Sequence, residues 1–164
     1  MKFSMSYMQS RDIDWFCCIE GIYVHIASAG GELPNIVNNR KILRKIQLAV
    51  SRLNDIYEEK QIIFNEEVIK KRLRSNIDRL IKRGVEVNLY NEEESYRNYI
   101  STFAAMARKG FVSYDRINIF DITDNRYSWV ARPYDFPQSR KPDLELPQLS
   151  LNELNFVELL QYCK

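Results

Sequence analysis

The only histidine of the chain, His25, is the side chain whose type most directly suggests catalysis. An imidazole titrates near neutral pH and can serve as a general base. In a strand, His25 would share one face with Tyr23 and Ala27, while three aliphatic residues would occupy the other face. We therefore expect a histidine at the surface or rim that is hydrogen-bonded to water. A general base beside the following loop is the alternative.

That following loop contains two glycines, and its backbone N–H groups could hold an anion. The candidate anion-binding residues are Ser28, Gly30 and Gly31, with Arg11 as the nearby cation. The loop lacks both the P-loop spacing and the GxGxxG spacing of phosphate-binding turns. A turn or open connector is therefore favoured over an anion site.

Two carboxylates lie at the entry to the first predicted hairpin. Asp12 and Asp14 are two residues apart, so in extended backbone they share a face, as acid–base catalysis requires. Ordinary turn chemistry explains the same segment, and we favour that interpretation.

Metal and redox motifs are not apparent. The sequence has no CxxC, HExxH or calcium-loop pattern, so we predict no metal site and no cofactor. The three cysteines are Cys17, Cys18 and Cys163, an odd number without disulfide spacing. Reduced thiols predict a cytoplasmic protein. Because neighbours on a strand face opposite sides, we expect one of Cys17 and Cys18 in the core and the other at the surface.

Positive charge is concentrated in the middle of the chain. Residues 40–83 carry thirteen basic and six acidic side chains, a net charge of +7, whereas the whole chain carries +2. If two predicted helices in this range were antiparallel neighbours, they would present one basic surface to an anionic partner. No nucleic-acid-reading motif is visible, so a solvated charged face is favoured over nucleic-acid binding. The candidate surface comprises Arg40, Lys41, Arg44, Lys45, Lys70, Lys71 and Arg74.

The elements that must position these residues begin and end with strands. β-Branched and aromatic residues predict one hairpin near each end of the main domain. Glu20-Gly21 suits a tight turn, because glycine accepts positive φ. The predicted strands are 13–19 and 22–27, with a further strand possible at 3–8, and 117–122 and 127–131 around a turn at 123–126.

Three helices are predicted between the hairpins. Apolar residues recur at helical spacing over 39–57. Asn65 and Asn91 are suitable N-caps for the second and third helices, which end at Gly84 and Gly110. A short stretch at 85–89 alternates like a strand. We find no internal repeat.

This order predicts an α+β fold, with an antiparallel sheet of four or five strands and about three helices on one face. Residues 1–132 form the predicted domain. Residues 133–164 form a proline-rich extension that includes a short amphipathic helix at 151–162, docked on the domain or on a second copy in a homo-oligomer.

The functional prediction is correspondingly general. We favour an intracellular binding or regulatory module whose basic surface meets an anionic partner, and we lean against an enzyme. The alternative is a small enzyme that uses His25 and the loop 28–31. No run of eighteen apolar residues is present, so no membrane association is predicted.

Overall fold

The computed structural model describes residues 1–87, 90–121, 123–150, 152 and 155–157. The fold is α+β, as predicted, and it contains a mixed sheet. Its helices in this part of the chain are α1 (Met5–Gln9), α2 (Arg40–Ser51), α3 (Glu66–Lys82) and α4 (Glu92–Arg108), with a 3₁₀ turn at Glu59–Gln61. Its strands are β1 (Asp14–Ile19), β2 (Ile22–Ala27), β3 (Ile62–Phe64), β4 (Val112–Arg116), β5 (Arg126–Pro133), β6 (Gln148–Leu149) and β7 (Asn155–Val157).

The sheet is mixed rather than antiparallel, which corrects the prediction. The strand order is β3-β5-β4-β2-β1-β6, and β7 pairs with β5. Both hairpins belong to this one sheet, as predicted, but β2 and β4 join them in parallel. The reason is the connection: the chain leaves β2, forms α2, β3, α3 and α4, and returns so that β4 runs in the same direction as β2.

The first hairpin has the predicted strands and turn. Glu20 and Gly21 adopt φ values of 49° and 82°, the left-handed conformations of a two-residue hairpin turn. Its register places Phe16 opposite His25 and Asp14 opposite Ala27. This register decides which side chains meet across the strands.

The second hairpin begins earlier than the sequence predicts. Its first strand is β4, at 112–116, whereas 117–121 is irregular. The sequence pattern misled because β4 contains polar residues that are nevertheless buried, Ser113, Asp115 and Arg116. The possible strand at 3–8 is also wrong, because Ser4 caps the short helix α1. No strand forms at 85–87, the described part of 85–89.

The helix boundaries follow the caps. Asn65 and Asn91 accept hydrogen bonds from Val68 N and Glu94 N, so α3 and α4 begin where predicted. Gly84 follows α3 with a φ of +72°. The helix α2 ends at Ser51, earlier than the predicted Tyr57, because the chain turns away although its apolar spacing continues.

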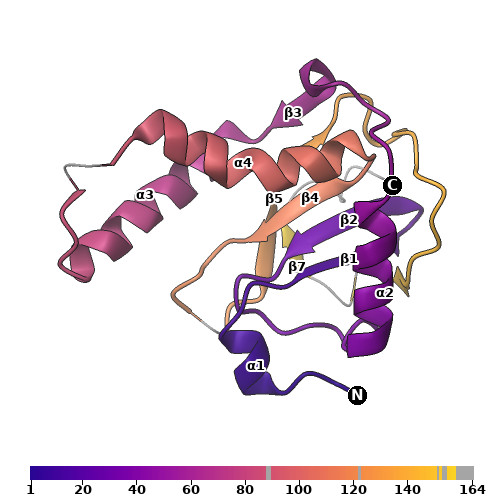
Figure 1. The fold of residues 1–164 in the computed structure, drawn as a ribbon, viewed down its shortest axis with the longest axis horizontal. Coiled ribbons are helices and arrows are strands. Elements are labelled where there is room, and N and C mark those ends of the chain that lie inside the picture. The colour runs from indigo at the N-terminus through magenta and orange to yellow at the C-terminus, as the bar shows by residue number, and fades with distance from the viewer. Residues whose placement is uncertain (88–89, 122, 151, 153–154, 158–164) are drawn as a thin grey trace.

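The three long helices pack over one face of the sheet (Figure 1). Beneath α2, Phe16 and Cys18 pack with Ile46 and Val50. Beneath α3 and α4, Ala27 packs with apolar residues of both helices. The other face contains Trp15, Cys17, Val24, Ile26, Val112 and Tyr114. Cys17 and Cys18 face opposite sides, as predicted, but both are buried, because each face is covered by packed residues, and on the Cys17 face these come from helices as well as loops.

The chain after β5 returns along the sheet. Leu146 packs on Phe16 and Cys18, and the hydroxyl of Tyr23 donates to the carbonyl of Leu144 at 2.5 Å. This part of the extension therefore lies against β1 and β2. Of the predicted helix at 151–162, only 152 and 155–157 lie within the described residues, and 155–157 forms β7 instead of a helix. Among the described helices, none has the length and apolar character needed to span a membrane.

Candidate functional site

A pocket of about 710 Å³ opens at one edge of the sheet. At this edge β1 begins and the parallel strands β2 and β4 end, so Asp14, Ala27 and Asp115 all lie there. The loops before β1 and after β2 and β4 line the pocket, together with one face each of α3 and α4. Open sheets commonly bind ligands outside the carboxyl ends of parallel strands.

His25 and Asp14 form a hydrogen-bonded pair at this edge. They are diagonal neighbours on the same face of the hairpin, and His25 Nε2 lies 3.0 Å from Asp14 Oδ1. Because a carboxylate only accepts, the Nε2–H is the donor. On the other side, β4 places Ser113 in register with His25, with its hydroxyl 3.1 Å from Nδ1. Both ring nitrogens therefore have partners within the sheet.

The two members of the pair differ in accessibility. His25 is fully buried, with its ring between those of Phe16 and Phe103, whereas the side chain of Asp14 is 46 % exposed and lines the pocket. The predicted surface or rim position of His25 is therefore wrong, because α4 covers this face of the sheet. A ligand in the pocket would meet Asp14, and His25 would act through Asp14.

The backbone beside Asp14 is also held in place. The side-chain amide of Gln47, on α2, donates to the Asp14 carbonyl at 2.7 Å. The predicted partner carboxylate, Asp12, lines the same pocket and accepts a hydrogen bond from Ala29 N at 2.8 Å. The structure thus brings both predicted carboxylates and the predicted loop to one site.

The loop N–H groups are already used within the protein. Gly30 N donates to Arg11 O, Gly31 N donates to Ser28 O, and Ser28 N donates to Ile13 O. The Ser28 hydroxyl accepts from Ile13 N at 2.8 Å. An anion near this loop would therefore depend on side-chain donors such as Arg11, which lines the pocket and lies over the ring of Tyr7.

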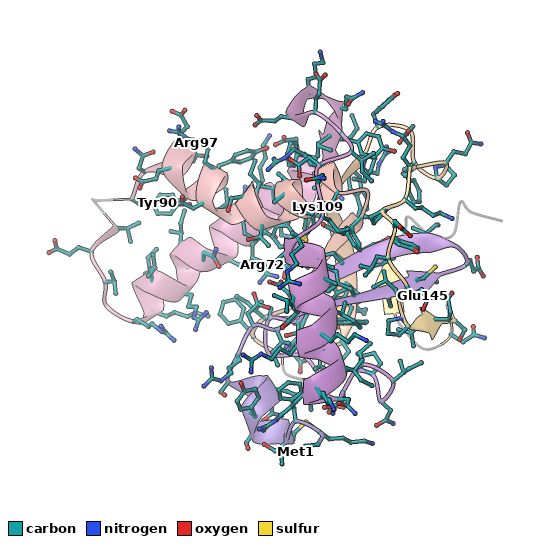
Figure 2. The ribbon with its side chains drawn as sticks, turned by 45° about the vertical axis from the view of Figure 1, so that its right-hand side comes forward. Met1, Arg72, Tyr90, Arg97, Lys109 and Glu145 are labelled. Carbon is teal, nitrogen blue, oxygen red and sulfur yellow. The ribbon has the colours of Figure 1, made fainter. Side chains whose placement is uncertain are left out.

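A third aspartate that lines the pocket, Asp115, lies inside a dense polar network. Its Oδ2 accepts from Arg72 Nη2 at 2.6 Å and from the Tyr99 hydroxyl at 2.7 Å. Its Oδ1 accepts from Arg116 N at 2.8 Å. Arg72 reaches this carboxylate from α3, whereas Arg97 of α4 is solvent-exposed (Figure 2).

Burial perturbs the acidity of this network. Desolvation raises the pKa of the Asp115 carboxyl above its ordinary value, although Arg72 and Tyr99 oppose that rise. Desolvation also raises the pKa of the Tyr99 phenol, and the neighbouring Asp115 carboxylate adds to the effect. Tyr99 therefore stays protonated at neutral pH and serves as a donor.

Arg116 forms hydrogen bonds to the loops on both sides of the pocket. Its side chain is buried, and its guanidinium donates to Asp124 O at 2.9 Å, to Ala29 O at 3.0 Å and to Asp121 O. One cation therefore joins the loop after β2 to the loop after β4. The geometry of the pocket rim depends on this residue.

The predicted basic residues do not form one surface. The helices α2 and α3 lie at opposite ends of the molecule (Figure 1), because α2 packs on β1 while α3 packs on α4 and β5. All seven side chains are exposed, four on α2 and three on α3. They comprise Arg40, Lys41, Arg44 and Lys45 in the first group, and Lys70, Lys71 and Arg74 in the second.

Arg72, Tyr99 and Asp115 were missed by sequence reasoning. They come from three separate elements, and Asp115 lies in a strand that the sequence pattern placed too late. The spacing of Arg72, Asn76 and Arg79 along one face of α3 was the available signal. Within the described residues, no group of three His, Cys, Asp or Glu side chains is placed to hold a metal ion.

Comparison with protein-family models, with curated proteins and with solved structures gives no significant match.

Proposed function

We propose that the chain is an enzyme in which Asp14 transfers protons to and from a substrate bound in the pocket. The observation that supports this most directly is the pairing of a half-exposed carboxylate with a fully buried histidine at the pocket edge. The carboxylate would take a proton from a bound hydroxyl or water and return it to a leaving group. His25 would orient Asp14, which makes it a positioning residue.

The surrounding groups suit this role. The Asp14 backbone is fixed by β1 pairing and by Gln47, so its carboxylate is held on a rigid element. Asp12 provides a second carboxylate in the same pocket. Arg72 is neutralised by Asp115. The Asp115 carboxylate therefore stabilises the fold and is not available as a base.

The test uses chromogenic p-nitrophenyl compounds, namely an acyl ester, a phosphate monoester, a phosphodiester and glycosides. Asp14→Asn keeps a hydrogen-bond acceptor for His25 but removes the base, so we expect turnover to fall by about 100-fold or more. Asp78→Asn, an exposed acid on α3, is the matched control and should leave turnover unchanged. Equal rates for wild type and Asp14→Asn would contradict the proposal.

A second candidate is a binding module that performs no chemistry. Lys70, Lys71 and Arg74 are exposed on α3, and no ion pair within the described part of the chain involves them. They remain available for an anionic partner, the function that the charge distribution favours. Salt-sensitive binding lost on their neutralisation, without turnover of any compound, would favour this candidate.

A further inference from the structure

We propose that the ligand of the pocket contains a nucleotide unit, a base and a sugar joined to a phosphate. This inference rests on the proposed function only in using the same pocket. It is carried by three kinds of lining group: arginines that pair with no carboxylate among the described residues, an exposed aromatic ring, and neutral or acidic groups that recognise hydroxyl and amino groups.

Two arginines supply the positive charge. Arg11 and Arg79 both line the pocket, and neither takes part in an ion pair among the residues that the structure describes. Arg79 shares the pocket-facing side of α3 with Arg72, whose charge is matched by Asp115. A guanidinium offers paired N–H donors that match phosphate oxygens. These two arginines therefore favour a ligand with a phosphate group.

An aromatic ring lies at the pocket rim and is held there. Phe120 lines the pocket and is 55 % exposed. Its backbone N–H donates to Asn118 Oδ1 at 3.1 Å, and Arg116 binds the next carbonyl, that of Asp121. Lys82 Nζ lies 5.5 Å from the ring centroid. An exposed ring on a loop that is held by hydrogen bonds is suitable for stacking against a base.

Other lining groups could form hydrogen bonds with the sugar and the base of a nucleotide. Asp12 and Asp14 can accept from sugar hydroxyls, and the amides of Asn76 and Asn98 can pair with the edge of a base. The pocket volume of about 710 Å³ lies within the range of small-molecule sites. Inorganic phosphate or a phosphosugar would leave the exposed part of the Phe120 ring uncovered, and a nucleoside would bring no anion to Arg11 and Arg79.

The first measurement titrates the full chain with adenosine 5′-monophosphate by calorimetry and by NMR of ¹⁵N-labelled histidine. His25 is the only histidine, so its imidazole signals need no assignment and report on Asp14. We expect saturable binding that shifts these signals. Adenosine and ribose 5-phosphate should each bind about 10-fold more weakly, since each lacks one recognised part.

Variants separate the two contacts. Arg79→Gln should weaken binding of the nucleotide by about 10-fold and leave binding of adenosine unaffected. Phe120→Ala should weaken binding of the nucleotide and of adenosine by about 10-fold each. The matched controls are Arg97→Gln, an exposed arginine on α4 outside the pocket, and Tyr134→Ala, an aromatic that is also 55 % exposed. Both controls should bind as wild type does.

A free nucleotide and the end of a nucleic-acid strand present the same unit, so single-stranded oligonucleotides form the second arm. Affinity that rises with strand length and falls steeply with salt identifies a strand, because extra phosphates would meet the basic side chains of α3. Affinity that is independent of length identifies a free nucleotide.

The inference is overturned if no nucleotide saturates the chain at millimolar concentration, or if ribose 5-phosphate binds as tightly as the nucleotide. Asp14→Asn keeps this result separate from the enzymatic proposal. Nucleotide binding without Asp14-dependent turnover supports the ligand but not the enzyme. Asp14-dependent turnover without nucleotide binding supports the enzyme but not the ligand.

Discussion

Asp14 and Asp115 line the same pocket, yet the protein treats the two carboxylates differently. Asp115 is 7 % exposed and receives three hydrogen bonds, two from side chains of α3 and α4 and one from the backbone. Asp14 is 46 % exposed and receives one from a side chain, His25, on the neighbouring strand. The first carboxylate is enclosed by its partners, and the second faces the pocket.

This difference indicates that the two carboxylates have separate roles, one structural and one chemical. A buried ion pair must be fully partnered, because an uncompensated charge in the interior is costly. Three donors already hold Asp115 in that network. Asp14 can meet a ligand without losing its partner, so chemistry is expected at Asp14 and stability at Asp115.

The largest expected effect is the loss of Asp115. Asp115→Ala leaves Arg72 buried without its counter-charge, and we expect it to lower the free energy of unfolding by about 3–5 kcal/mol. Urea unfolding measures this, with Asp14→Asn expected within about 1 kcal/mol of wild type. The double variant Arg72→Met/Asp115→Leu should recover much of the loss. A double variant that shows only the sum of two independent losses would contradict this account of the pair.

The next effect concerns the partner of Asp14. His25→Ala opens a cavity beside Phe16 and Phe103, so we expect the free energy of unfolding to fall by about 2–4 kcal/mol. His25→Gln places an amide N–H near the Nε2 position and should lose less. If both variants unfold at the wild-type urea concentration, His25 is not part of the packed interior.

A smaller effect concerns pH. The raised pKa of Tyr99 means that its stabilising contribution is fully present below the ordinary value of 10.0 and is lost as pH rises further toward the folded-state pKa. Unfolding free energies measured from pH 7 to 12 should therefore fall more steeply above pH 10 for wild type than for Tyr99→Phe. Tyr99→Phe itself should lose about 1 kcal/mol at pH 7, since Asp115 loses one donor. Parallel pH profiles would contradict the role assigned to Tyr99.

The smallest effect is expected outside the pocket. Neutralising Lys70, Lys71 and Arg74 together should change the free energy of unfolding by less than about 1 kcal/mol, because all three are exposed. Calorimetry with the pocket ligand should also show unchanged affinity for a free nucleotide. A large loss of stability would show that these side chains have structural partners.

Part of the candidate site could be predicted from the sequence. Asp12, Asp14 and His25 were candidates by residue type and spacing, although turn chemistry and a surface position were the favoured interpretations. The hairpin turn at Gly21 determines the register that brings Asp14 to His25. Burial of His25 could not be predicted, because it depends on Phe103 from a helix far along the chain. The ion pair of Arg72 with Asp115 likewise joins residues that are 43 positions apart.

Local chemistry determined the first hairpin and both ends of α3 and α4, since turns and caps depend on a few neighbouring residues. The tertiary structure decided the parallel pairing of β2 with β4, the packing of Leu146 against Phe16 and Cys18, and the separation of α2 from α3. It also decided that Asp14 meets the pocket while Asp115 is enclosed. These outcomes depend on which distant surfaces exclude water together, and local spacing carries no information about that choice.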